Sequence, residues 1–199
     1  LIGEVSKNKL IVPRGIQPGD ALLLTKGVPI EATALLAREF PEKLKDVLRP
    51  QEIVEAAEYL HRPGISITKD AQVATQAGRV TGMHDPTEGG LSAALWEMAQ
   101  ASQLDIHIDP RKVLIPDLSA RICSAFGLDP LATIASGALL AAVHPEDVDK
   151  IVAALTDHSI PVSRIGTFHK GSGKVYSDLA GAIQSWPYPE RDEIGKVYE

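Results

Sequence analysis

The sequence has little cysteine, few aromatic residues and no long apolar run. Its one cysteine, Cys123, can form neither an intrachain disulfide nor a multi-thiolate zinc site, which favours the reducing cytosol. The longest apolar stretches, such as Ala138 to Val143, are far shorter than the ~20 residues of a membrane-spanning helix. Lys and Arg number 20 against 26 Asp and Glu, a net charge of -6. That charge disfavours general attraction to nucleic acid or to an anionic membrane, so an anionic ligand requires a local site.

What is present is the composition of a folded globular protein. The chain has 199 residues, of which 44% are hydrophobic and 23% are charged. A chain of this length buries roughly 70% of the surface that it exposes when unfolded, which is enough for a full core. No fixed-period repeat or low-complexity linker divides it, so we expect one domain. Because it begins Leu1-Ile2-Gly3 without a methionine, we expect it to be part of a longer protein.

Hydrophobic periodicity predicts strands that alternate with helices. Short apolar or alternating runs predict strands over 21–25, 80–84, 105–108 and 138–143, and a hairpin of 162–168 with 174–176. Apolar residues at helical spacing predict helices over 30–40, 51–60, 68–77, 91–102, 118–126 and 145–155. The fold class is therefore α/β (α+β): a single domain with a mixed β-sheet flanked by helices. We place this domain at 19–186, a leading segment at 1–18, and a polar tail or short helix at 187–199.

One segment, residues 84–90, joins a predicted strand to the clearest predicted helix. Pro86 favours an extended conformation for Asp85 and so ends the strand there. Thr87 is suited to cap the helix. Gly89 and Gly90 then fall in the first helical turn, where each glycine costs about 1 kcal/mol relative to alanine.

Two reasons for this glycine pair stay open. The functional one is close approach of an anion, because free backbone N–H groups and the positive end of the helix dipole favour a phosphate there. The structural one is a tight strand-to-helix turn in which the glycines only relieve crowding. The functional reading makes Thr87, Glu88, Gly89 and Gly90 phosphate-binding residues. His84 and Asp85 lie beside them at the carboxyl end of the predicted strand, where open α/β sheets bind ligands.

Two further turns have a similar character. The turn at 25–27 follows a predicted strand, and its lysine could hold a phosphate as a point charge or could simply be solvated. The turn at 136–137 precedes the buried strand 138–143. We expect 25–27 and 84–90 to share one edge of the sheet, because both follow strands. The residues concerned are Thr25, Lys26, Gly27, Glu31, Ser136 and Gly137.

Three features that resemble functional motifs do not predict a site. Lys170 to Lys174 resembles the end of a P-loop, but no glycine stands five residues before Gly173, and no Ser or Thr follows. The six histidines never occur four apart around a glutamate, so no zincin-type site is supported. Cys123 lies on a predicted helix beside Ile122, which favours a buried structural thiol over a nucleophile.

Several motifs resemble the second half of the aminoimidazole ribonucleotide (AIR) synthase superfamily. The strongest is the run His-Asp-Pro-Thr-Glu-Gly-Gly-Leu at 84–91, with the helix through Ser102 and the strand 106–108. Its Asp-Pro-Thr form resembles the AIR synthase-related and HypE-type hydrogenase maturation proteins in particular. The resemblance covers most of residues 15–170. Further agreement comes from Pro18-Gly19-Asp20, Gly127 to Leu131, Ala135 to Leu139 and Arg164-Ile165-Gly166.

The resemblance implies an α/β domain that completes an active site together with an N-terminal ATP-binding half of the same protein. It implies ATP and Mg2+ as cofactors of the intact protein, a small phosphorylated or amide-bearing substrate, and a homodimer. It implies His84 and Asp85 as catalytic candidates that handle a proton or a magnesium ion, with Asp85 as the candidate metal ligand. The implied reaction is activation of an amide-like oxygen by phosphorylation, followed by ring closure, amination or elimination. The parent protein would be a cytoplasmic ligase, cyclo-ligase or dehydratase-like enzyme, and the isolated domain would be inactive.

Two alternatives stay open. A HypE-like ATP-dependent dehydratase fits the loop, although HypE proteins end in a cysteine-bearing tail and this sequence ends Ile194 to Glu199 without cysteine. A non-catalytic scaffold domain would keep the glycine loop for structural reasons. A Rossmann or P-loop nucleotide binder is disfavoured, because neither fingerprint follows a predicted strand.

Overall fold

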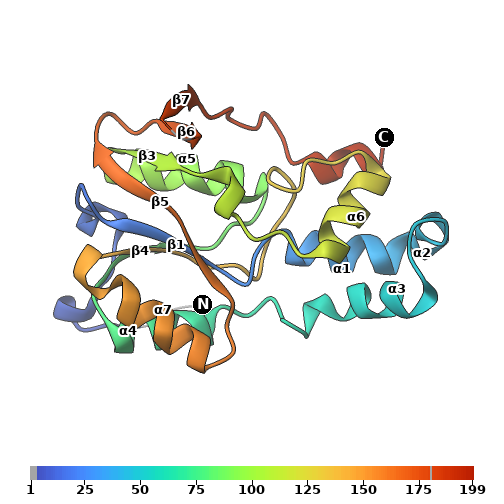
Figure 1. Ribbon diagram of the computed structural model, residues 1–199, viewed down its shortest axis with the longest axis horizontal. Helices are drawn as coiled ribbons and strands as arrows, with labels where there is room; N and C mark the ends of the chain where they lie inside the picture. The colour runs from blue at the N-terminus through green and yellow to red at the C-terminus, as the bar shows by residue number, and fades with distance from the viewer. Residues whose placement is uncertain (1–3, 180) are drawn as a thin grey trace.

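The computed structural model describes residues 4–179 and 181–199. These residues form a seven-stranded sheet with the strand order β2-β4-β1-β5-β3-β6-β7 (Figure 1). The predicted α/β class with a mixed sheet is confirmed. The strands are β1 Ala21–Thr25, β2 Val80–His84, β3 Leu104–Ile108, β4 Leu140–Val143, β5 Val162–Lys170, β6 Val175–Leu179 and β7 Ala182–Ser185.

Strand directions decide which loops can meet. β1 pairs antiparallel with both β4 and β5, and β2 pairs antiparallel with β4. β1 and β2 therefore run in the same direction with β4 between them, and their carboxyl ends lie at the same edge of the sheet. Farther along, β3 is antiparallel to β5 and parallel to β6, and β6 is antiparallel to β7.

Helices cover both faces of the sheet (Figure 1). α5 lies on one face, α4 and α7 pack together on the other, and α1, α2, α3 and α6 group beside the sheet. Within the described ranges, no helix is long and apolar enough to cross a membrane. The α-helices are α1 Ile30–Glu39, α2 Pro41–Leu44, α3 Pro50–Ala57, α4 Thr68–Ala77, α5 Gly90–Ser102, α6 Asp117–Phe126 and α7 Val148–Asp157. Short 3-10 helices are η1 Lys7–Lys9, η2 Pro13–Gly15, η3 Glu58–Leu60, η4 Pro110–Lys112, η5 Pro145–Asp147 and η6 Glu193–Val197.

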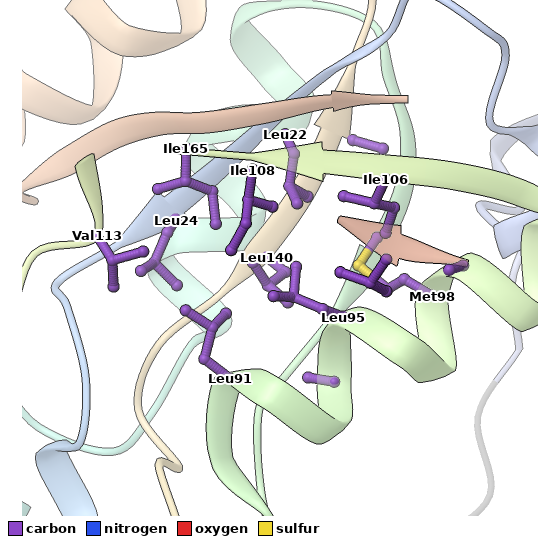
Figure 2. Close-up of a cluster of buried hydrophobic side chains, with 14 of the residues drawn as sticks. Leu22, Leu24, Leu91, Leu95, Met98, Ile106, Ile108, Val113, Leu140 and Ile165 are labelled. Carbon is purple, nitrogen blue, oxygen red and sulfur yellow. The ribbon is translucent and has the colours of Figure 1, made fainter. Parts of the chain in front are cut away.

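The largest core lies between α5 and the sheet. Leu91, Leu95 and Met98 of α5 point toward Leu22 of β1 and Ile108 of β3, and each of these side chains is at most 1% exposed (Figure 2). Full burial of such a side chain contributes roughly 1.5–3 kcal/mol. This packing fixes the position of α5, and with it the loop that precedes the helix.

A second core lies on the opposite face. Leu23 of β1 and Val143 of β4 pack there against Val73 of α4 and Ile151 of α7. β1 is thus buried on both faces, which explains why its apolar run is continuous rather than alternating.

The predicted hairpin of 162–168 with 174–176 is wrong. β3 lies between β5 and β6, because Ile106 pairs with Phe168 on one side and with Val175 on the other. Asp105 holds the connecting turn across the start of β3, since its carboxylate accepts the backbone N–H groups of Ser172 at 2.8 Å and Lys174 at 2.9 Å. The sequence predicts these strands and the turn between them, but it does not predict which strands pair with each other.

Cys123 lies in a third core, between α1, α3 and α6, where it is 1% exposed. Burial, with a smaller contribution from the charge of Asp129, raises the pKa of its thiol to about 12. Because the thiolate is the reactive form, we expect iodoacetamide at pH 8 to label the folded protein at least about a hundredfold more slowly than the denatured protein. Mass spectrometry of timed samples measures both rates. Equal rates would contradict a buried structural thiol.

Candidate functional site

Two of the predicted loops meet at the edge of the sheet where β1 and β2 end. Leu140 of β4 pairs with both Leu24 of β1 and His84 of β2. The structure therefore brings 25–27 and 84–90 to one edge, as the strand directions require.

The third predicted turn, 136–137, lies at the same edge. The Thr25 N–H donates to the carbonyl of Leu139 at 3.0 Å, just after this turn. The Ala135 N–H donates to the carbonyl of Thr87 at 3.3 Å, just before it. The turn is thus hydrogen-bonded on both sides to the loops that follow β1 and β2.

The loop before α5 differs from its prediction in one respect. Asp85 is exposed and Pro86 is buried, as expected of a strand end. The helix starts at Gly90, however, and its N-cap is Gly89 with a φ of 74°. Thr87 is therefore not the cap: its carbonyl accepts the Gly90 N–H at 3.0 Å and closes a turn ahead of the helix.

The backbone N–H groups of Gly89 and Gly90, two of the donors expected for an anion, bond within the protein. The Gly89 N–H donates to the carboxylate of Asp192 at 2.6 Å. The same carboxylate accepts the N–H groups of Ile134 at 3.2 Å and Ile194 at 2.8 Å. The helix dipole that would favour a phosphate favours this carboxylate for the same reason. The Asp192 carboxylate thus binds the Gly89 N–H that the functional reading assigns to an anionic ligand.

Asp192 reaches the loop because the chain after β7 crosses the molecule to end beside α6 (Figure 1). Trp186 Nε1 donates to Ser92 Oγ at 3.2 Å. The ring of Tyr188 packs edge-on against Trp96 with a centroid distance of 6.0 Å. The segment 187–199 therefore packs along α5 and ends in η6.

Gly90 has protein backbone where a ligand was expected. A β-carbon at this position would lie 2.6 Å from the carbonyl oxygen of Thr133 and 2.9 Å from that of Leu131. The φ of Gly90 is 60°, in the left-handed region that favours glycine. These contacts favour the structural reading of the glycine pair over close approach of an anion.

Lys26 belongs to a buried polar network at the end of β1. Its amine donates to the carbonyls of Ser66 at 2.9 Å and Gly64 at 3.3 Å, and lies 3.3 Å from Asp70 Oδ2. Thr25 Oγ1 donates to Asp70 Oδ1 at 2.6 Å. Burial lowers the pKa of Lys26, and the charge of Asp70 opposes that shift.

This network accounts for the three hydrogens of the Lys26 amine, so the amine is not free for a phosphate in this conformation. Asp70 was not predicted to take part. It lies in the first turn of α4, where an acidic residue ordinarily needs no partner beyond the helix dipole. Its burial to 2% exposure is visible only in the structure.

The glycines of these turns pack closely against neighbouring loops. A β-carbon at Gly27 would lie 2.6 Å from the Leu114 carbonyl oxygen, and one at Gly137 would lie 3.1 Å from the Gly64 carbonyl oxygen. Glu31 is different, because its Oε2 is buried with no hydrogen-bond partner among the residues described. That oxygen could accept a hydrogen bond from a ligand.

His84 has a partner that was not predicted. Its Nε2 lies 2.6 Å from Glu97 Oε2 on α5, and such a carboxylate fixes the orientation of the ring. Four other polar side chains at this edge make no side-chain hydrogen bond within the described part of the chain. They are Asp85, Thr87, Glu88 and Ser136.

These residues do not fit a magnesium site by themselves. In 4–179 and 181–199, no three His, Cys, Asp or Glu side chains gather as a metal-binding group. Asp85 and Glu88 are both exposed, and Mg2+ requires near-octahedral coordination by six oxygens. These side chains alone therefore do not supply the ligands of a magnesium ion.

Comparison with known proteins gives a consistent result. Residues 17–178 match the family described as AIR synthase related protein, C-terminal domain. The chain is 33% identical over 163 residues to a putative hydrogenase expression/formation protein of Methanocaldococcus jannaschii, covering 80% of this chain and 44% of that protein. It is 30% identical over 144 residues to the carbamoyl dehydratase HypE of Rhizobium leguminosarum bv. viciae, covering 72% and 38%. The chain thus spans less than half the length of either relative.

The fold is also similar to a solved structure. The crystal structure of a hydrogenase maturation protein HypE in complex with ATP matches with a TM-score of 0.67 and 22% identity, covering 94% of this chain and 56% of that one. At this level of identity the likeness shows the fold alone.

Proposed function

The chain belongs to the AIR synthase related protein family as its C-terminal domain, and from this premise we propose that it is the second half of an ATP-dependent enzyme. The enzyme activates an amide-like oxygen of a small substrate by phosphorylation. A HypE-like dehydration of a carbamoyl group is the form of this reaction that the relatives favour.

The chemistry explains why ATP is needed. The oxygen of an amide is a poor leaving group, but once it carries the γ-phosphoryl group of ATP it can depart as phosphate. Phosphorylation of the oxygen releases one proton from the amide nitrogen, and loss of the second proton as phosphate departs completes a dehydration. Attack by a nucleophile on the activated carbon instead gives amination or ring closure. HypE, a carbamoyl dehydratase with a solved ATP complex, is related to this chain in sequence and fold.

The observation that carries the proposal is the set of unpaired polar side chains at the edge where β1 and β2 end. Ligands of open α/β sheets bind at the carboxyl ends of strands. Asp85, Thr87 and Ser136 offer acceptors and hydroxyl donors there without having to break an existing hydrogen bond. His84, held by Glu97, is suited to move a proton near neutral pH.

The missing parts of the site are assigned to a preceding half of the same protein. This chain spans 44% and 38% of its two relatives, which leaves room for such a half. The described residues present no metal-binding group, so the acidic ligands and the main ATP contacts belong to that half in our proposal. The dimer contact belongs there as well.

We expect the 199-residue chain alone to fold without turning over ATP, and the longer protein that contains it to turn ATP over. In the longer protein, Asp85→Asn should lower steady-state turnover at least tenfold, equivalent to about 1.4 kcal/mol, because an exposed carboxylate at the reacting edge is lost. Asp157→Asn at the end of α7 is the matched control and should leave turnover unchanged.

Thermal unfolding of both variants separates a lost function from a lost fold. Asp85 and Asp157 are both exposed, so neither change should alter stability by more than about 0.5 kcal/mol. Full turnover by the Asp85→Asn protein would remove Asp85 from the site. Turnover of ATP by the 199-residue chain alone would overturn the assignment of a half-enzyme.

A further inference from the structure

Among the residues that the structure describes, no α-helix packs on half of one sheet face, and only the 3-10 helix η4 lies beside it. α4 and α7 cover β2, β4 and β1 on this face, but β5, β3 and β6 extend beyond them (Figure 1). Ile106, Ile108 and Phe168 point to the α5 side, so the alternate residues His107, Thr167 and His169 point to the uncovered side. The uncovered half-face is therefore polar.

A pocket of about 430 Å³ lies on this half-face. Three rings lie close together there: the centroid of His107 is 4.2 Å from that of His169 and 5.2 Å from that of Tyr176. Polar side chains of β3, β5 and η4 surround the two imidazoles. An ordinary solvated strand face has the same alternation, but this one also has a pocket that is lined by three cationic side chains.

Of the three cations around the pocket, one forms an ion pair within the described chain and two do not. Arg111 is neutralised by Asp109, which accepts two side-chain hydrogen bonds from it at 2.8 Å each. Arg164 instead donates to the uncharged Thr167 Oγ1 at 3.2 Å. Neither Arg164 nor Lys112 forms an ion pair with any carboxylate that the structure describes. Asp105 and Asp178 are the opposing charges near the imidazoles. Asp178 accepts the N–H of Gly181 at 2.8 Å, and Asp105 accepts the N–H groups of residues 172 and 174.

The imidazoles of His107 and His169 add hydrogen-bond donors to the lining of the pocket. Partial burial, together with the neighbouring His107, lowers the pKa of His169, and the charges of Asp105 and Asp178 oppose that shift. A bound anion would oppose this shift, because it stabilises the imidazolium form. The pKa of His169 thus reports an anion in the pocket.

We propose that this pocket is a binding site for a small tetrahedral oxyanion, such as the phosphate group of a phosphorylated metabolite. Arg164 and Lys112 supply charge, and Thr167 and the two imidazoles supply further donors to its oxygens. The site is separate from the edge that carries 84–90, because it lies on the face opposite α5. Because the net charge of the chain is -6, an anion requires a place where positive charge is concentrated, and this pocket is such a place.

Sulfate is the probe that tests the proposal, because it stays dianionic from pH 5 to 8. The imidazole signals of His107 and His169 are followed by NMR as sulfate replaces chloride at constant ionic strength. We expect saturable chemical-shift changes of both rings and a higher apparent pKa for His169. Arg164→Ala should weaken sulfate binding at least fivefold, whereas Arg14→Ala removes an exposed arginine beside β2 and should leave it unchanged.

Two outcomes would overturn the site. The first is an absence of saturable shifts in the wild-type protein. The second is an equal loss of affinity in the Arg164→Ala and Arg14→Ala proteins, which would indicate general charge screening. Because Arg164 is exposed, its variant should fold normally, and thermal unfolding checks this. ATP turnover by the longer protein plays no part in the readout, so this proposal stands or fails independently of the proposed function.

Discussion

Replacement of Gly90 by alanine is expected to lower the free energy of unfolding by about 3 kcal/mol. Part of this loss, about 1–2 kcal/mol, comes from placing an alanine at a φ of 60°. The rest, about 1–3 kcal/mol, comes from the new β-carbon, which would lie 2.6 Å from the Thr133 carbonyl oxygen. Backbone atoms cannot rotate away as the end of a side chain can, so the segment 131–133 must shift. Denaturant unfolding monitored by circular dichroism measures the change.

Gly127→Ala is the matched control. Gly127 has a φ of 67° at the end of α6, and a β-carbon there would meet nothing within 4 Å. Its variant therefore carries the left-handed strain alone and should lose only about 1–2 kcal/mol. An equal loss in the two variants would show that the contact between Gly90 and 131–133 is not tight.

This expectation follows from the crowding of Gly90 and has the opposite sign to that for a glycine in an uncrowded helix. A glycine merely tolerated in a helix would make Gly90→Ala stabilising by a few tenths to about 1 kcal/mol. A phosphate cradle would keep the fold and lose only anion affinity. The structure instead places the carbonyls of Leu131 and Thr133 against Gly90, 41 and 43 residues along the chain, and no local pattern can reveal such a contact.

What the sequence predicted well are features that depend on neighbouring residues. The apolar run at 21–25 and the stripe of Leu91, Leu95 and Met98 correspond to β1 and α5, because burial dictates their periodicity. The shared edge of 25–27 and 84–90 also followed, since each turn comes directly after a strand. Helix α2 and strand β7, each four residues long, have no counterpart in the prediction because they are too short to show a period.

What the sequence did not predict are partners that are distant along the chain. Asp192 and Glu97 look like ordinary charged residues of a polar tail and of an exposed helix face. Only the folded chain shows that Asp192 accepts the N–H of Gly89 and that Glu97 lies 2.6 Å from His84. The insertion of β3 between β5 and β6 is of the same kind, because strand order is a property of the whole sheet.

The buried lysine gives the other large expected effect. Lys26→Met keeps the length of the side chain and removes its charge, leaving the Asp70 carboxylate at 2% exposure without its cation. Breaking one side of a buried ion pair typically costs about 3–5 kcal/mol. The carbonyls of Gly64 and Ser66 would lose a donor at the same time. We expect the free energy of unfolding to fall by about 3–5 kcal/mol, measured by denaturant titration at pH 7.

A double-mutant cycle with Asp70→Asn shows whether the loss belongs to the pair. Asparagine keeps an acceptor for the Thr25 hydroxyl, so the double variant removes both charges and keeps that hydrogen bond. It should lose about 1–3 kcal/mol less than the sum of the single variants. Lys69→Met, which removes an exposed lysine from the same helix as Asp70, should change stability by no more than about 0.5 kcal/mol. If Lys26→Met behaved like Lys69→Met, the amine would be free, and its assignment to a phosphate would regain support.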